Sequence, residues 1–347
     1  MSKKVFVGMS GGVDSSVTAA LLLRDGYDVT GVYMKNWSQD LPGFICPWQE
    51  DYQDAKRVAV QLGIDFKMYD FEKEYRSRVV DYMVAGYQAG ITPNPDIMCN
   101  QEVKFKLFLD AALADGADLI ATGHYARSEN GQLLTGIDTN KDQSYFLYRV
   151  TAKALTRSLM PIGGYAKPRV RELAAEFKLA TAAKKDSQGI CFVGKVGIKD
   201  FLLAELGPQP FGAIVDQNGV TIGEHDGALF YTIGQRHGLD IGGGLPYYVV
   251  GKAMAKNEVY VTTNLQDSRL WRGQLTLSAL HWINEPPLDG QQLQVRTRYR
   301  APLVDCVVVV EASQVSLSLS EEVRAITPGQ SAVLYDGQRV VGGGIVI

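Results

Sequence analysis

The chain has 347 residues, of which 46% are hydrophobic and 21% are charged, and its formal net charge is −3 at pH 7. This length and composition are typical of a soluble globular protein built from two or three domains. No apolar stretch is long enough to span a bilayer and no signal segment is recognisable, so membrane contact is excluded. The acidic balance excludes a general attraction for nucleic acid, so any RNA contact must come from local basic patches.

The first predicted elements are a buried strand over Lys4–Gly8 and a helix over Val13–Arg24. Glycines and small polar residues join them, and such a loop brings backbone N–H groups and the helix dipole to a phosphate. Asp14 is placed to hold Mg²⁺ on phosphate oxygens. The predicted nucleotide contacts of this loop are Gly8, Met9, Ser10, Gly11, Gly12, Val13, Asp14 and Ser15.

Two better-known glycine loops are excluded. The Walker loop ends in Gly-Lys-Ser/Thr, whereas Asp14-Ser15 stands there in this chain. The dinucleotide fingerprint Gly-x-Gly-x-x-Gly is absent from this turn. The loop Ser10-Gly-Gly-Val-Asp-Ser15 resembles the pyrophosphate (PP) loop of ATP pyrophosphatases, which cleave ATP between its α and β phosphates. An ordinary glycine-rich turn between strand and helix is the alternative.

From Lys3 to about Ala180, β-type apolar runs alternate with helical stretches, which predicts a doubly wound parallel sheet covered by helices. The further strands are expected at 28–33, 65–69 and 118–122, and the further helices at 50–62, 71–90 and 104–115. In such sheets ligands bind at the carboxyl edge. That edge should hold the glycine loop, Met34 and Gly123-His124.

After about Gly207 glycines become frequent and long helical patterns stop, so Phe211–Asn264 is interpreted as a small β-rich module. Alternating strands from about Thr276 predict a compact antiparallel β-barrel. The expected domains are therefore 1–200 (catalytic), 201–275 (β-rich) and 276–347 (barrel). In the barrel, Arg296, Arg298 and Arg300 are expected on one strand face, where they could grip phosphates.

Two of the four cysteines lie in polar surroundings. Cys99 follows Asn94-Pro-Asp at the expected mouth of a helix, where the dipole favours a thiolate, and Asp96 could manage protons. Cys191 follows two lysines and a glycine. Both cysteines could instead be buried hydrophobic residues, which is the commonest state of an unpaired cysteine. Cys306 is expected in the core and Cys46 stays ambiguous. No Cys-x-x-Cys spacing points to structural zinc.

Several ordered motifs extend over essentially the whole chain. They are Gly8–Ser15, Thr92–Asn100, Ala121–Arg127, Asp142–Leu147, Lys185–Cys191, Tyr231–Gly238 and Arg298–Arg300. Together they resemble those of bacterial tRNA-specific 2-thiouridylases, a family of the PP-loop ATP pyrophosphatase superfamily. The resemblance implies a sulfurtransferase that replaces the C2 oxygen of the wobble uridine (U34) by sulfur in tRNAs for Lys, Glu and Gln.

The resemblance also implies a mechanism. ATP, with Mg²⁺, adenylates the base and makes AMP the leaving group, and a flipped-out uridine faces the segment Asn94-Pro95-Asp96. Cys191 matches the cysteine that carries a persulfide, Cys99 its nucleophilic partner, and Asp96 the general acid/base. A transient disulfide between Cys99 and Cys191 is implied. The expected partners are the anticodon stem-loop of the tRNA and a protein that donates persulfide sulfur to a monomeric, cytoplasmic enzyme.

Further contacts follow from the same resemblance. Met34 and Gly123 match positions near the adenosine. Positions that match tRNA contacts are His124, Lys141, Asp142, Gln143, Arg298, Tyr299 and, more weakly, Gln330.

Three alternatives stay open on the sequence. Asp96, Cys99 and Cys191 could hold an iron–sulfur cluster, although three such ligands are fewer than the usual four cysteines, and the metal-free persulfide route is favoured. A nitrogen-transferring ligase on the same loop would need no paired thiols. A non-catalytic tRNA-binding protein that senses ATP is disfavoured by Asp96 and the two cysteines in polar loops.

Overall fold

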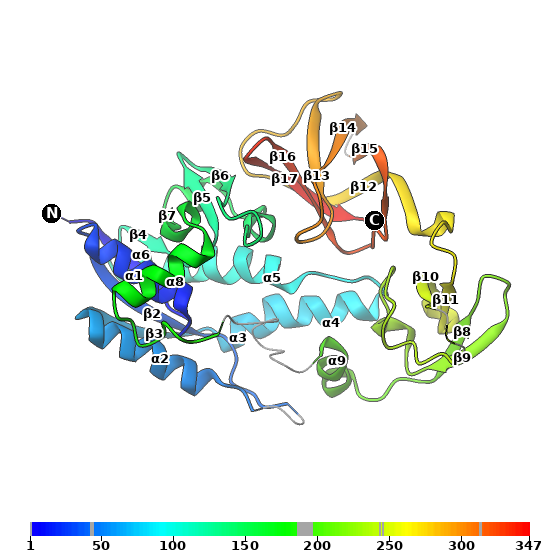
Figure 1. The fold of residues 1–347 in the computed structure, drawn as a ribbon, viewed down its shortest axis with the longest axis horizontal. Helices are drawn as coiled ribbons and strands as arrows, with labels where there is room; N and C mark the ends of the chain where they lie inside the picture. Colours follow the sequence, from blue (N-terminus) through cyan, green and yellow to red (C-terminus); the bar gives the residue numbers. More distant parts are fainter. Residues whose placement is uncertain (1, 42–44, 186–196, 243, 245, 312–313) are drawn as a thin grey trace.

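The structure is a computed structural model, and it describes residues 2–41, 45–185, 197–242, 244, 246–311 and 314–347. Figure 1 shows an α/β unit at the N-terminal end, a small sheet at the opposite end and a barrel above helices α4 and α5. None of the helices in these described ranges is long and apolar enough to cross a membrane.

The N-terminal unit is built on a parallel sheet of strand order β3-β2-β1-β4-β7. Phe6 in the central strand lies between Thr30 and Ile120 of its neighbours. Because the chain adds strands on one side of β1 and then on the other, the order reverses between β1 and β4, where ligands of such sheets bind. The strands are β1 (Lys4–Gly8), β2 (Asp28–Lys35), β3 (Asp65–Asp70), β4 (Leu119–Ala121) and β7 (Ser158–Leu159).

Helices cover both faces of this sheet, as the alternation of apolar runs with helical stretches along the chain predicts. Phe6 and Ile120 belong to the core cluster that includes Phe108 of α6 (Phe108–Ala114). Val5 and Val7 point to the other face and pack in a second cluster with residues of three helices. These helices are α1 (Val13–Arg24), α2 (Trp48–Leu62) and α8 (Lys167–Glu176). The predicted doubly wound α/β class is confirmed.

The helix predicted over 71–90 is present as a continuous run with a wider π-type turn in its middle. The helix predicted to begin at Lys104 begins earlier, at Pro95, which is a correction. Asn94 caps it, because its side-chain oxygen accepts hydrogen bonds from the N–H groups of Asp96 and Ile97. The segments are α3 (Glu72–Tyr75), η1 (Arg76–Val80) and α4 (Asp81–Gln88), then α5 (Pro95–Met98) and the π-helical η2 (Cys99–Leu107) leading into α6.

The middle of the chain forms the expected small β-rich unit after helix α9 (Ile198–Leu206). Its four strands have the order β10-β11-β8-β9, and its core contains Ile214, Val249 and Val259. The elements are β8 (Gly212–Val215), β9 (Thr221–His225), β10 (Tyr248–Ala253) and β11 (Glu258–Thr262), with short η5 (Ala228–Phe230), η6 (Met254–Lys256) and η7 (Ser268–Leu270).

The predicted antiparallel barrel is confirmed, and it is closed because β12 pairs with both β15 and β17. The hairpin of β5 and β6 from the N-terminal unit extends the same sheet by pairing β6 with β17. Sequence reasoning did not foresee this connection. The strands are β12 (Trp271–Trp282), β13 (Gln292–Arg296), β14 (Val304–Glu311), β15 (Gln314–Arg324), β16 (Ser331–Asp336), β17 (Arg339–Val346), β5 (Ala126–Glu129) and β6 (Gln132–Thr135).

Between β6 and α8 the chain forms short elements only, namely η3 (Ser144–Leu147), α7 (Ala152–Leu155), the strand β7 given above and η4 (Pro161–Gly164).

The expectation that Arg296, Arg298 and Arg300 share one strand face is wrong. Strand β13 ends at Arg296, and the chain then turns, with the N–H of Ala301 bonded to the carbonyl of Arg298. Arg300 has a positive φ of 63°, which an extended strand does not allow. The three guanidinium groups therefore have separate surroundings.

Candidate active site

The glycine loop leaves β1 and enters α1 as predicted. Gly11 has a φ of 72°, and a Cβ there would lie 2.3 Å from the carbonyl oxygen of Asp51 in α2, so only glycine fits. Gly12 is the N-cap of α1 without a side-chain cap, which leaves first-turn N–H groups for a ligand. The Ser15 hydroxyl accepts a hydrogen bond from the N–H of Ser10 at 3.2 Å and thereby fixes the loop.

The side chains of the loop differ in their availability. Met9 is 1% exposed and packs at Gly31, so only its backbone is available to a nucleotide. The Met34 side chain lies against Gly8, at the end of β1. Asp14 stays partly exposed, with 32% of its side chain accessible.

Asp14 has two partners that sequence reasoning missed. Its carboxylate accepts hydrogen bonds from the Lys167 ammonium at 2.7 and 2.9 Å and from the Tyr125 hydroxyl at 2.8 Å. Lys167 stands in the first turn of α8, 153 residues away along the chain. The site therefore contains a cation beside the phosphate-binding loop. No local motif around Lys167 signals this contact.

The end of β4 connects this loop to the next part of the site. A Cβ on Gly123 would lie 2.9 Å from the carbonyl carbon of Asp14 and from the nitrogen of Ser15, so the two backbones touch. His124, the next residue, is buried, its Nδ1 lies 2.8 Å from the Thr122 hydroxyl oxygen, and its ring packs near Phe105 of η2. Burial lowers the pKa of His124 well below 6.5, with the nearby Lys104 acting in the same direction, so the imidazole is neutral at pH 7.

Asp96 lies in the first turn of the capped helix. Burial raises the pKa of its carboxyl above the ordinary value of 3.8, and the positive charge of Lys104 opposes that rise. Because Lys104 acts on both Asp96 and His124, these three groups share one neighbourhood. Lys104, which sequence reasoning noted only as part of the helix, belongs among the candidate site residues. A carboxyl with a raised pKa suits proton transfer near neutral pH.

Cys99 lies in the second turn of this helix, not at its mouth, which corrects the sequence-based expectation. Its side chain is 3% exposed and belongs to an apolar cluster with Trp37, Tyr75 and Phe201. In the state described, bulk solvent does not reach the thiol. The neighbouring Asn100 donates a hydrogen bond to the carbonyl of Phe146 at 3.1 Å.

Cys191 lies outside the described residues, as do residues 186–190 of the predicted motif. The described residues on either side have clear anchors. Lys184 donates to the carboxylates of Asp51 and Asp54 in α2, at 2.8 and 2.7 Å, beside the glycine loop. On the other side, Phe201 of α9 belongs to the apolar cluster that contains Cys99, and its ring lies 6.0 Å from that of Trp37.

Two of the residues matched to tRNA contacts, Gln330 and Arg298, lie near the segment that leads to Asn94. The Gln330 side chain donates a hydrogen bond to the carbonyl of Thr92 at 2.7 Å, and the N–H of Thr92 donates to the carbonyl of Pro328. Arg298 donates to the Thr327 hydroxyl and to the carbonyls of Ile233 and Ala325, so it joins the barrel to the middle unit. Arg298 and Gln330, together with Thr232–Gln235, line a concavity of about 380 Å³.

Tyr299 and the segment 141–143 occupy the same side of the barrel. The ring of Tyr299 lies 4.5 Å from that of Phe146 and 5.0 Å from the Arg300 guanidinium. Asp142 is 4% exposed and forms an ion pair with Arg296 at 3.2 Å, so its carboxylate supports the local fold. The N–H and side-chain oxygen of Gln143 are both bonded to the backbone of Tyr125.

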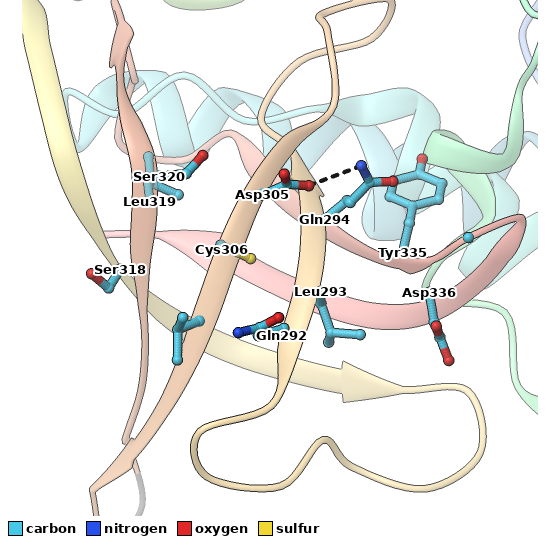
Figure 2. A pocket seen from close by; sticks show the side chains of 12 residues that line it. Gln292, Leu293, Gln294, Asp305, Cys306, Ser318, Leu319, Ser320, Tyr335 and Asp336 are labelled. Carbon is cyan, nitrogen blue, oxygen red and sulfur yellow. Dashed lines mark hydrogen bonds between the residues drawn. The ribbon is translucent and has the colours of Figure 1, made fainter.

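A larger concavity, of about 530 Å³, belongs to the barrel and includes no residue of the glycine loop. Figure 2 shows its lining, with Gln294 bonded to Asp305 and Cys306 between the strands. Cys306 is 3% exposed, as expected of a core cysteine, and burial raises its pKa to about 11. Cys46 is half-buried near the carbonyl of Trp37.

No group of three or more His, Cys, Asp or Glu side chains that could hold a metal ion occurs in the part of the chain that the structure describes. Because Cys191 lies outside that part, the hypothetical set of Asp96, Cys99 and Cys191 is not tested by this observation. At the glycine loop, Asp14 offers one carboxylate next to the expected phosphates. One carboxylate beside substrate phosphates is a donor set that Mg²⁺ commonly uses, and here Mg²⁺ would share this carboxylate with the Lys167 ammonium, which contacts both of its oxygens.

A glycine loop at the switch point of a parallel sheet, with a cation and a carboxylate beside it, defines a nucleotide-binding enzyme of the HUP and PP-loop class. Three family profiles match consecutive parts of the chain: the tRNA methyl transferase HUP domain at residues 3–195, the tRNA methyl transferase PRC-barrel domain at 199–263, and the aminomethyltransferase beta-barrel domain at 272–346.

Curated relatives match over the full length. The tRNA-specific 2-thiouridylase MnmA of Bacillus subtilis (strain 168) is 46% identical over 351 residues, covering 99% of this chain and 94% of the relative. The protein of the same name from Streptococcus agalactiae serotype III (strain NEM316) is 48% identical over 354 residues, covering 99% and 95%. The chain belongs to the tRNA-specific 2-thiouridylase family, which confirms the resemblance seen in the motifs.

Solved structures are more distant. A 4-thiouridine synthetase in complex with RNA and ATP is 18% identical with a TM-score of 0.38, covering 56% of this chain and 46% of that one. The U34-tRNA thiolase NcsA from Methanococcus maripaludis is 17% identical with a TM-score of 0.36, covering 54% and 61%.

Proposed function

We propose that this enzyme uses ATP to replace the C2 oxygen of the wobble uridine of tRNA by sulfur, with release of AMP and pyrophosphate. The observation that carries this proposal is the direct backbone contact of Gly123 with Asp14 and Ser15 of the glycine loop. Through this contact the phosphate site adjoins the neighbourhood of Asp96, Lys104 and His124. A base held at Asn94-Pro95-Asp96 would then present its C2 oxygen toward the α-phosphate of ATP.

The first step is adenylation. The C2 oxygen attacks the α-phosphorus, the bond to the β-phosphate oxygen breaks, and pyrophosphate leaves with the electron pair. The N–H groups of the first turn of α1 and the ammonium of Lys167 stabilise the developing negative charge. Mg²⁺ held at Asp14 would neutralise phosphate charge. Asp96, with its raised pKa, exchanges the proton of the base.

The second step transfers sulfur. The terminal sulfur of a persulfide on Cys191 attacks C2, and AMP leaves with the oxygen. The Cys99 thiolate then attacks the Sγ atom of Cys191, which forms a disulfide and releases the sulfur on C2. An external thiol reduces this disulfide and a sulfur donor protein restores the persulfide. This pairing is supported by the anchoring of Lys184 to α2 beside the glycine loop and by the place of Phe201 in the cluster that contains Cys99.

Because Cys99 is buried in an apolar cluster, this mechanism requires that tRNA binding uncovers it. The proposed tRNA contacts around the site are Asn94, Pro95, His124, Lys141, Asp142, Gln143, Arg298, Tyr299 and Gln330. The substrates are tRNAs for Lys, Glu and Gln, bound through the anticodon stem-loop by a monomer. A reducing cytosol fits four cysteines without close spacing.

The test is incubation of the protein with tRNA, ATP-Mg²⁺ and a persulfide as the sulfur donor, followed by mass spectrometry of the nucleosides and quantitation of AMP. The expected result is 2-thiouridine with AMP in equal amounts. The variant Cys99→Ser should lose thiolation, whereas the matched variant Cys306→Ser should retain it. A ligase that transfers nitrogen would remain active after Cys99→Ser. The absence of both products from the unmodified protein would refute the proposed enzymatic activity.

A further inference from the structure

The Asp14 carboxylate of the glycine loop is held by two groups, the Tyr125 hydroxyl and the Lys167 ammonium. Both partners are themselves fixed by one turn of the chain, Asp138–Gln143. This turn includes Lys141–Gln143, the segment proposed above to contact tRNA. The arrangement places an RNA-contacting turn at the end of two hydrogen-bonded paths that lead to the ATP site.

The first path runs through Tyr125. The N–H of Tyr125 donates to the side-chain oxygen of Gln143 at 3.0 Å, and its carbonyl accepts from the N–H of Gln143 at 2.9 Å. Two bonds between the same two residues fix both position and orientation. The Tyr125 side chain is 2% exposed, and its hydroxyl ends on Asp14 at 2.8 Å. Because a buried phenol needs a polar partner, this hydroxyl follows any shift of the Tyr125 backbone.

The second path runs through Asp138. One carboxylate oxygen of Asp138 accepts from the N–H of Asn140 at 3.0 Å and from that of Lys141 at 3.2 Å. The other oxygen accepts from the backbone N–H of Lys167 at 2.8 Å. This bond sets the start of α8, from which the Lys167 side chain reaches Asp14. One side chain thus connects Lys141 and Lys167.

The turn is also held from the barrel side. Asp142 pairs with Arg296, and Arg300 donates to the carbonyl of Asn140 at 2.9 Å. RNA that engages the barrel and the turn therefore acts on a packed, hydrogen-bonded unit. Such units shift between discrete arrangements and do not deform gradually.

We propose that Tyr125, Asp138 and Gln143 form a positioning network that couples tRNA engagement at residues 141–143 to the Asp14 carboxylate in the ATP loop. This inference rests on the proposed function and adds a physical link between its two substrates. Tyr125 and Asp138 are positioning residues, since they act on the phosphate site through Asp14 and Lys167. By linkage, tRNA and ATP then change each other's affinity by the same factor.

The test measures this factor directly. The dissociation constant of α,β-methylene-ATP, which resists cleavage at the reacting bond, is determined with and without a saturating anticodon stem-loop RNA. For the unmodified protein we expect a change of about fivefold or more. For Tyr125→Phe, which removes only the hydroxyl and leaves the path through Asp138 in place, we expect a clearly smaller change than in the unmodified protein. The variant Asp138→Ala interrupts the other path and should reduce the factor as well, and thermal melting confirms that each variant is folded.

The matched control is Tyr260→Phe, because the Tyr260 hydroxyl also donates to a carboxylate, that of Glu258 at 2.6 Å, but in the middle unit. It should keep the full coupling factor. The inference is overturned if the unmodified protein shows no coupling, if Tyr125→Phe retains it in full, or if Tyr260→Phe loses it equally. The proposed function is judged separately, by formation of 2-thiouridine in the unmodified protein, so the two failures are distinguishable.

Discussion

The substitution Gly123→Ala tests the closest contact between β4 and the ATP loop. The added Cβ would lie 2.9 Å from the Asp14 carbonyl carbon and from the Ser15 nitrogen, whereas ordinary van der Waals contact begins near 3.4 Å. Both atoms belong to the backbone, so the loop must move by about 0.5 Å to make room. Overpacking of this kind costs about 1–3 kcal/mol of stability. A displacement of 1 Å at a reacting centre costs about 10²-fold in rate, so about a tenfold loss is expected here.

The assay for this variant is AMP formation in the presence of tRNA, together with urea unfolding. The matched control is Gly164→Ala, because a Cβ at Gly164 meets no atom within 4 Å and the backbone there is not left-handed. It should leave both the rate and the stability unchanged. If Gly123→Ala is folded and forms AMP at the normal rate, the loop is not held against β4 as described, and the reasoning is refuted.

Three further substitutions separate the roles of individual groups. Lys167→Met should lower AMP formation about 10²-fold and leave tRNA affinity within about twofold, because it removes the cation at the phosphates; equal losses in both would contradict that role. Since burial raises the pKa of Asp96, the stability it contributes is present at low pH and is lost as the pH rises through its folded pKa. Asp96→Asn should therefore unfold at higher urea than the unmodified protein at pH 7, with no advantage below pH 3.8, and yet lose thiolation; a destabilised variant at pH 7 would contradict this. Cys306→Ala should cost about 1 kcal/mol of barrel stability in thermal melting and retain full thiolation, and a loss of activity would contradict its assignment to the core.

The sequence predicted those features that depend on local patterns. The continuous apolar run Val5–Val7 indicated a buried strand of the sheet, and the small residues between β1 and α1 indicated the phosphate loop. The sequence did not predict the start of a helix at Pro95. Pro and Asn are common in turns, so the segment around Asn94 is interpreted as a loop, although Asn94 caps the helix. The helix start that the sequence did not predict is therefore part of the candidate site, because this helix carries Asp96 and Cys99.

Local sequence patterns do not predict contacts between residues that are distant along the chain. The ion pair of Lys167 with Asp14 joins residues 153 positions apart, and the pairing of β6 with β17 joins the catalytic unit to the barrel. No periodicity encodes such partners. The alternation after Thr276 predicted strands, but it could not show that the chain turns at Arg298 and separates the three arginines.

The central claim is that ATP activates the very oxygen that sulfur replaces. The direct measurement uses a stem-loop RNA whose wobble uridine carries ¹⁸O at C2, incubated with the protein, ATP-Mg²⁺ and a persulfide as the sulfur donor. Mass spectrometry of the released AMP should show one ¹⁸O atom for each thiolated uridine formed. Unlabelled AMP alongside 2-thiouridine would contradict the claim, because the oxygen would then have left C2 without passing to the α-phosphate.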